Sequence, residues 1–127
     1  MFLTGYPPED LLLREDFLDE SERCSKELEE LSKEISIIIG CPIREGENIF
    51  NAAIFYQNGK IVKNYKKQIL PNYKEFDEKR YFLKGEVHEV FEDRDLKLGI
   101  SICEDIWNED FTKELCNQDI DLIVNIS

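Results

Sequence analysis

A single cysteine carries the clearest chemical signal in this chain. Cys103 ends an apolar, β-type run, Leu98-Gly-Ile-Ser-Ile, and acidic residues follow it directly. A thiol placed after a buried strand lies at the C-terminal edge of the sheet, where open α/β sheets carry their reactive groups. Such a thiol acts as a nucleophile when a nearby cation or base favours its thiolate form. Lys66 and Lys67 can supply that cation.

Both residue types also have a simpler interpretation. Free cysteine is among the most buried residue types, so Cys103 taken alone could be an inert core thiol. A Lys-Lys pair at the end of a strand is more often solvated than functional. The surrounding sequence has to decide between these interpretations and catalysis.

The composition limits the class of protein. A chain of 127 residues forms one small domain at most, and 42% hydrophobic residues are enough for a core. The formal net charge of −12 argues against binding to a nucleic-acid backbone or an anionic membrane surface. No apolar run approaches the roughly 18 residues of a membrane span, and no signal peptide is recognisable. We therefore expect a cytoplasmic protein with no nucleic-acid or membrane partner.

The cysteines indicate neither a zinc site nor disulfides. Cys24, Cys41, Cys103 and Cys116 show no Cys-x-x-Cys spacing, and His88 is the only histidine. Structural zinc sites take four such ligands, usually from closely spaced pairs. We expect no metal in this chain, and reduced thiols of the kind usual in the cytosol.

Hydrophobic periodicity predicts an alternation of helices and strands. Residues 8–36 show a helical pattern with a possible break at residues 19–22, and the residues expected on its apolar face are Leu18, Cys24, Leu28, Leu31 and Ile35. The expected strands are residues 37–40, 49–56, 60–65, 87–91, 96–102 and 121–125, and a second helix covers residues 108–118. Asn58-Gly59 predicts a tight hairpin, because both positions of a type I′ turn need φ > 0. Residues 71–82 predict an ordered loop.

Both ends of the sequence are typical of a cut through a longer fold. The chain starts on a Gly-Tyr-Pro-Pro turn and stops directly after an expected buried strand. We therefore expect an incomplete sandwich with an exposed sheet face and free strand edges. Such surfaces favour association, so the isolated chain is expected to be poorly soluble or oligomeric.

Several longer motifs resemble the nitrilase, or carbon–nitrogen hydrolase, superfamily. They are Leu3-Thr-Gly-Tyr-Pro-Pro-Glu-Asp-Leu-Leu12, Lys67-Gln-Ile-Leu-Pro-Asn-Tyr73, Phe76-Asp-Glu-Lys-Arg-Tyr-Phe82, Gly99-Ile-Ser-Ile-Cys-Glu-Asp-Ile-Trp107 and Asp121-Leu-Ile-Val-Asn-Ile-Ser127. The second and third motifs are more similar to the glutaminase domain of glutamine-dependent NAD synthetases than to nitrilases at large. The resemblance covers residues 1–127 and implies an α/β fold, part of a nitrilase-like αββα sandwich.

The resemblance implies a Glu–Lys–Cys catalytic triad. Cys103 would attack the side-chain amide of glutamine, form a thioester and release ammonia. Lys67 would favour the thiolate and stabilise the oxyanion that develops during attack. It is preferred to Lys66 because a Leu-Pro pair follows it at the family spacing.

Further site residues are implied by position within the same motifs. Glu78 matches a second glutamate that orients the lysine and the substrate, and its alternative is a surface charge cluster with the two basic residues after it. Tyr73 and Glu104 match positions that line the glutamine pocket, although Tyr packs well in any core and an acid after a strand often caps a helix. Tyr6 is a further candidate for the pocket wall. His88 matches no motif and is expected to be structural.

One element of the family pattern is missing from this sequence. The family's general base is a glutamate that shortly precedes Leu-Thr-Gly-Tyr, and here that position falls before Met1. Glu9 lies beyond the Pro-Pro turn and matches a different position. Because the base takes the thiol proton and later activates water, we expect residues 1–127 alone to be inactive.

By resemblance, the complete protein hydrolyses glutamine and passes ammonia to an ATP-dependent synthetase domain that amidates deamido-NAD. ATP and Mg²⁺ would serve that domain, which is absent from this sequence, and the glutaminase part would need no cofactor. The implied partners are glutamine, the synthetase domain of the same polypeptide and further copies in a homo-oligomer. Two alternatives stay open: a stand-alone hydrolase of another small amide, and a non-catalytic remnant without the general base.

Overall fold

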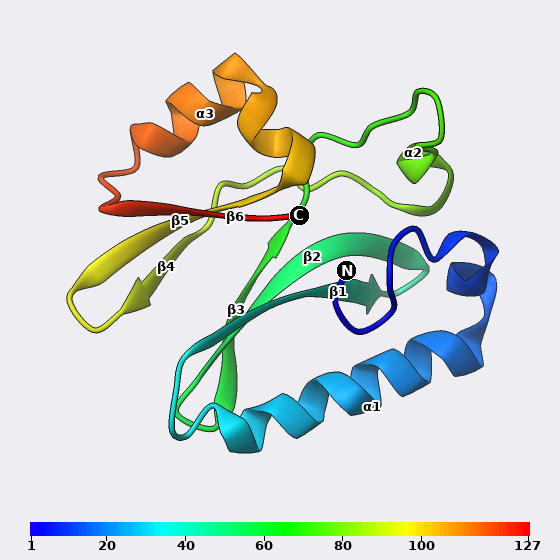
Figure 1. Ribbon diagram of the computed structural model, residues 1–127, viewed down its shortest axis with the longest axis horizontal. Coiled ribbons are helices and arrows are strands. Elements are labelled where there is room, and N and C mark those ends of the chain that lie inside the picture. Colours follow the sequence, from blue (N-terminus) through cyan, green and yellow to red (C-terminus); the bar gives the residue numbers. More distant parts are fainter.

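The chain folds into two three-stranded sheets, each flanked by a helix (Figure 1). The computed structural model describes all residues from Met1 to Ser127. The first sheet contains β1 (Ile37–Glu45), β2 (Asn48–Gln57) and β3 (Lys60–Lys66), and the second contains β4 (Val90–Asp93), β5 (Leu96–Ile102) and β6 (Leu122–Ile126). The helices are α1 (Glu15–Leu31), α2 (Glu78–Tyr81) and α3 (Glu109–Cys116), with the 3₁₀ helices η1 (Glu9–Leu13) and η2 (Cys103–Trp107).

The alternation of side chains along β2 explains the order of the layers. Ala53 and Phe55 belong to the core cluster shared with β5 and α3, whereas Ile54 and Tyr56 pack against β1 and α1. Successive residues of a strand point to opposite faces, so an apolar run such as β2 is buried on both sides. The layers follow the order α1, first sheet, second sheet, α3, which confirms the expected αββα arrangement (Figure 1).

Strand pairing follows the turn signals in the sequence. β1, β2 and β3 form an antiparallel meander, and Asn58 and Gly59 join β2 to β3 with φ values of 53° and 78°. The predicted hairpin is therefore confirmed. In the second sheet β4 is antiparallel to β5, while β6 runs parallel to β5 after the crossover through α3. Cys103 thus follows the central strand of its sheet.

The N-terminal helix differs from the prediction. Extended backbone at Arg14 separates η1 from α1, and α1 then runs without a break through residues 19–22. Its buried residues are Leu18, Ser21 and Ser25, whereas Leu31 and Ile35 are exposed. Small serines let the helix lie close to the first sheet, where Ser25 hydrogen-bonds the hydroxyl of Tyr56. An apolar pattern alone could not reveal this partly polar contact.

Two strands also depart from their predicted limits, and a third departs from its predicted burial. β1 continues through Pro42 to Glu45, which is possible because it is an edge strand and needs no hydrogen bond from that nitrogen. β4 begins at Val90, three residues later than expected. β6 was predicted to be buried, but it lies at the edge of its sheet and none of its residues is fully buried.

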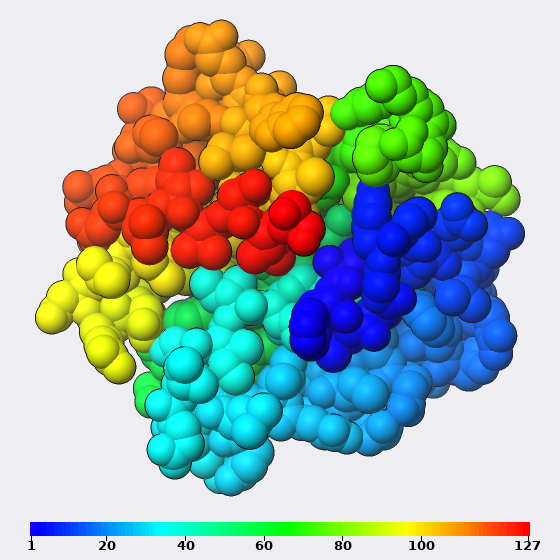
Figure 2. Space-filling model, in the orientation of Figure 1, coloured from blue at the N-terminus to red at the C-terminus, as the bar shows by residue number.

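The two ends of the chain lie beside each other on one face of the molecule (Figure 2). Met1 and Ser127 line the same cavity, which also reaches the first residues of β1. No helix has the length and apolar character needed to cross a membrane.

Candidate active site

One cavity gathers several of the residues that could carry chemistry. It has a volume of about 680 Å³, and its wall includes Tyr6, Asn51, Lys67, Glu78 and Cys103. Glu78 is the only acidic side chain in that wall, and most of the other lining residues are hydrophobic. The cavity therefore combines a thiol, an ammonium and a carboxylate within a largely apolar wall.

The backbone at Cys103 presents its side chain outside the core. Cys103 directly follows β5, begins η2, and has a φ of 47°, in the left-handed region. That conformation costs a residue with a Cβ about 1–2 kcal/mol, and such strain is concentrated at functional sites. Cys103 is exposed, unlike Cys41, which is buried in the core and whose thiol pKa is raised to about 11 by burial. An inert core thiol therefore describes Cys41 and not Cys103.

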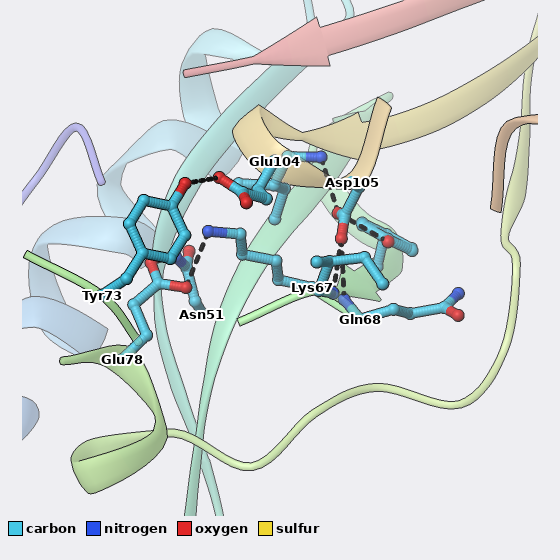
Figure 3. A network of polar contacts seen from close by, with 10 residues as sticks. Asn51, Lys67, Gln68, Tyr73, Glu78, Glu104 and Asp105 are labelled. Carbon is cyan, nitrogen blue, oxygen red and sulfur yellow. Dashed lines mark hydrogen bonds and ion pairs between the residues drawn. The ribbon is translucent and has the colours of Figure 1, made fainter. Parts of the chain in front are cut away.

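Lys67 and Glu78 form a buried ion pair beside this turn (Figure 3). The Nζ of Lys67 donates to Oε2 of Glu78 at 2.7 Å, and the two side chains are only 1% and 3% exposed. Lys67 is held where the chain leaves β3, and Glu78 begins the short helix α2. Lys66 points elsewhere, because its Nζ lies 2.6 Å from Oε2 of Glu45.

Asn51 supports both members of the ion pair. Its side-chain nitrogen donates to Oε1 of Glu78 at 3.1 Å, and its backbone carbonyl accepts from the backbone nitrogen of Lys67 at 2.8 Å. The side-chain oxygen of Asn51 is buried and has no hydrogen-bond partner. An unsatisfied buried acceptor costs free energy, so this asparagine is placed for its contacts with the pair rather than for its own stability.

Tyr73 and Glu104 form a second hydrogen-bonded pair (Figure 3), and Glu104 directly follows Cys103 in the chain. The hydroxyl of Tyr73 donates to Oε2 of Glu104 at 2.7 Å. This hydrogen bond to the carboxylate raises the pKa of Tyr73. Tyr6 lines the cavity, and burial, followed by the charge of Glu78, raises the pKa of its phenol.

Comparison with known proteins shows the family of the chain. A protein-family model described as carbon-nitrogen hydrolase matches residues 1–127. The chain belongs to the carbon–nitrogen hydrolase family. The structure contains no group of three or more His, Cys, Asp or Glu side chains that could hold a metal ion.

The relatives of this chain include synthetases that are much longer than the chain itself. It is 39% identical over 131 residues to a glutamine-dependent NAD(+) synthetase of Thermotoga maritima, covering 100% of this chain and 23% of that protein. The corresponding protein of Aquifex aeolicus is 40% identical over 128 residues, covering 98% of this chain and 22% of that protein. The chain therefore spans less than a quarter of the length of these relatives.

Solved structures show the same relationship. The glutamine-dependent NAD+ synthetase of Acinetobacter baumannii superposes with a TM-score of 0.86 and 38% identity, over 97% of this chain and 23% of that structure. An amidase from the nitrilase superfamily, from Nesterenkonia, superposes with a TM-score of 0.80 over 96% of this chain and 47% of that structure. Its identity is only 18%, so this likeness shows the fold alone.

The structure places the residues expected from the sequence in two groups. Cys103, Lys67, Glu78 and Tyr6 line the cavity. Tyr73 and Glu104 lie outside its wall but next to Cys103, with their hydrogen-bonded pair facing solvent. The surface cluster considered for Glu78 is wrong, since this side chain is buried against Lys67.

Two residues of the site were missed by sequence reasoning. Asn51 is a polar residue within an otherwise apolar strand, and that interruption was the available signal. Asp105 is fully buried and binds backbone from both the Cys103 and the Lys67 segments. Its signal was weaker, because an aspartate in the first turn of a helix is common for purely local reasons.

Proposed function

We propose that this chain is the glutamine-hydrolysing part of a larger enzyme, with Cys103 as its nucleophile. One observation carries the proposal: an exposed thiol in a strained turn lies on the same cavity as a buried lysine–glutamate pair. Glutamine is supported as the amide by the relatives, which cover the whole chain at about 40% identity and are named for glutamine dependence. The proposal concerns the side-chain carboxamide of glutamine.

The proposed reaction has two halves. The Cys103 thiolate attacks the carboxamide carbon, and the ammonium of Lys67 stabilises the negative charge that develops on the oxygen. The carbon–nitrogen bond then breaks, ammonia leaves with the proton first taken from the thiol, and a thioester remains on Cys103. Water attacks the thioester, glutamate departs, and the thiol recovers its proton.

Glu78 is proposed to hold Lys67 rather than to act as the general base. One of its oxygens binds the ammonium of Lys67 and the other accepts from Asn51. A carboxylate in this arrangement fixes the direction of the lysine side chain. By resemblance, the general base is a glutamate that precedes the Leu3–Tyr6 pattern, so residues 1–127 alone are expected to be inactive.

Tyr73, Glu104 and Tyr6 are proposed to bind the substrate. The carboxylate of Glu104 lies beside Cys103 and can pair with a cationic group on the part of the substrate that is not cleaved. The phenol of Tyr73 directs that carboxylate, and Tyr6 forms part of the cavity wall. This arrangement suits an amide that also carries an ammonium group.

The ammonia is proposed to serve a synthetase domain of the same polypeptide. The support is that the relatives are named NAD(+) synthetases and are more than four times as long as the part matched here. ATP and Mg²⁺ would act in that other domain, and the hydrolytic half uses only side chains and water. A homo-oligomer and a cytoplasmic location are proposed on the same resemblance.

Ammonia release from glutamine tests the proposal directly. The protein expressed from its complete open reading frame is compared with a Cys103→Ala variant and with Cys116→Ala, which removes an exposed thiol on α3. We expect Cys103→Ala to abolish ammonia release and Cys116→Ala to leave it unchanged. Activity that survives Cys103→Ala would contradict the proposed nucleophile.

The same assay with other amides separates the remaining alternatives. A panel of small aliphatic amides, asparagine and glutamine is offered to the folded protein. Preference for a different amide, lost in Cys103→Ala, would favour a hydrolase of that amide over a glutaminase. Failure on every amide, in a protein shown to be folded, would favour the non-catalytic alternative.

A further inference from the structure

We propose that Asp105 is a positioning residue that fixes the nucleophile segment and the lysine segment of this site against each other. The inference rests on the proposed function, because it assigns a role within the same site. Asp105 lies two residues after Cys103 in η2 and is completely buried. Its carboxylate accepts four hydrogen bonds from two segments of the chain, residues 65–69 and Ile102 (Figure 3).

One oxygen of Asp105 secures the turn that carries Cys103. Oδ2 accepts from the backbone nitrogen of Ile102 at 2.9 Å and from the hydroxyl of Tyr65 at 2.8 Å. Ile102 is the residue directly before Cys103, whose backbone lies in the unfavourable left-handed region. A strained conformation persists only where its surroundings hold it, and this hydrogen bond closes the strained turn.

The other oxygen secures the segment that follows Lys67. Oδ1 accepts from the backbone nitrogens of Gln68 at 3.1 Å and Ile69 at 2.7 Å. These residues lie beyond the end of β3, where the strand ladder no longer supplies partners for backbone groups. The two oxygens of one side chain therefore join the end of β5 to the end of β3.

The chemistry of the Asp105 carboxylate suits a role in fixing the positions of other groups. None of the hydrogen-bond donors to Asp105 is a cationic side chain, so its charge is balanced only by dipoles. Burial raises the pKa of Asp105, and its hydrogen bonds from the backbone and Tyr65 oppose that effect. A buried carboxylate without a counter-ion is costly, whereas it offers four acceptor positions in a fixed plane. An asparagine offers one acceptor oxygen and would set its NH₂ group against two donors.

Positioning matters here because the two segments carry the reacting thiol and its cation. A displacement of about 1 Å between reacting groups can cost about 100-fold in rate. We therefore expect Asp105→Asn to lower kcat by about 100-fold while KM changes by less than about threefold. A loss confined to stability would leave kcat per folded molecule unchanged.

A second measurement needs no substrate. The rate at which iodoacetamide alkylates Cys103 is followed against pH by peptide mass spectrometry, with the exposed Cys116 of the same molecule as internal reference. The titratable groups that face Cys103 are those of Lys67, Glu78, Glu104, Tyr6 and Tyr73. When Lys67 is no longer held beside the thiol, the midpoint of Cys103 alkylation should move to higher pH, and that of Cys116 should stay.

The variants are Asp105→Asn, Asp105→Glu and Ile54→Ala. Ile54→Ala destabilises the core on the α1 side of the first sheet, and Ile54 itself does not line the cavity, so it shows what lost stability alone does. Asp105→Glu keeps a carboxylate but displaces it by one methylene. If Asp105→Asn does not fold, this variant still tests whether the position of the carboxylate matters. We expect the kcat and alkylation changes in the Asp105 variants and not in Ile54→Ala.

A folded Asp105 variant with the wild-type kcat and alkylation profile would overturn the proposal. Changes of equal size in Ile54→Ala would also overturn it, because they would trace to stability. The two readouts keep this inference separate from the proposed function. A shifted alkylation profile in a protein that hydrolyses no amide would support positioning by Asp105 and contradict the glutaminase.

Discussion

The ammonium of Lys67 lies 2.7 Å from the carboxylate of Glu78, and both side chains are almost fully buried. The other ion pairs of the chain all include at least one partly or largely exposed side chain. Removing one member of a buried pair leaves an uncompensated charge and typically costs about 3–5 kcal/mol. Disturbing the pair is therefore expected to lower the stability of the fold. Both of its members line the cavity that Cys103 also lines.

We predict that Lys67→Met lowers the free energy of unfolding by about 3–5 kcal/mol and abolishes ammonia release. Lys66→Met is the matched control, because its partner Glu45 is half-exposed and such pairs contribute about 0–1 kcal/mol. Urea unfolding and the ammonia assay provide the two readouts. The double variant with Glu78→Leu should recover part of the stability and none of the activity. Recovery of activity would contradict a catalytic role for the lysine.

Gly85 brings the loop after α2 into contact with the lysine segment. Its backbone nitrogen donates to the carbonyl of Lys67 at 2.8 Å, and a Cβ at this position would lie 2.2 Å from the carbonyl oxygen of Lys66. We predict that Gly85→Ala displaces Lys67 and lowers kcat at least about tenfold, together with the melting temperature. Gly46→Ala, in an open turn with φ of 60°, should cost about 1–2 kcal/mol and leave kcat unchanged. Equal kcat in both variants would contradict this prediction.

The hydrogen bond between Tyr73 and Glu104 should act on substrate binding. Tyr73 is exposed and Glu104 is half-buried, so Tyr73→Phe should change the free energy of unfolding by less than about 1 kcal/mol. We predict a severalfold higher KM for glutamine with little change in kcat, because the carboxylate of Glu104 loses its fixed direction. Tyr81→Phe is the matched control, since it removes a similar exposed hydrogen bond, to Asp10 at 2.6 Å, away from Cys103. A KM that rises equally in both variants would rule out a specific role for Tyr73.

Asp93 makes the stability depend on pH at the far end of the sandwich. Hydrogen bonds from Ser36 and, to a smaller degree, Gln57 lower the pKa of Asp93 below its ordinary value of 3.8. The folded state therefore binds fewer protons here than the unfolded state, and this stabilisation is present above pH 3.8 and lost as the pH falls below it.

We predict a shallower loss of stability below about pH 4 for Asp93→Asn than for the wild type. Asp95→Asn, in the same turn and without a side-chain hydrogen bond, should keep the wild-type slope. Urea unfolding at a series of pH values measures both. Identical slopes for the wild type and Asp93→Asn would show that the hydrogen bonds of Asp93 do not stabilise its charged form.

Local sequence patterns account well for β5 and for the turn between β2 and β3. β5 occupies residues 96–102 as expected, because a continuous apolar run with β-branched residues specifies a strand buried on both faces. The Asn58-Gly59 turn was equally predictable, because few residue types readily adopt the positive φ values that both positions require. The serine face of α1 could not be predicted, because it depends on how closely the helix approaches β1 and β2.

The candidate site was only partly accessible from the sequence. The resemblance named Cys103, Lys67 and Glu78, and the structure places all three on one cavity. Hydrogen bonds across tertiary structure carry no local signature, which is why Asn51 and Asp105 escaped notice. Asp105 contacts Gln68 and Ile69 from 36 or 37 positions along the chain.

Mass spectrometry of an acid-quenched reaction tests the central claim most directly. The protein from the complete open reading frame is mixed with glutamine, quenched within the first turnovers and digested. We predict that the peptide containing Cys103 gains the mass of one glutamyl group, that hydroxylamine removes it, and that Cys103→Ala never acquires it. Steady ammonia release with no adduct on Cys103 at any quench time, or an adduct on another residue, would contradict the account.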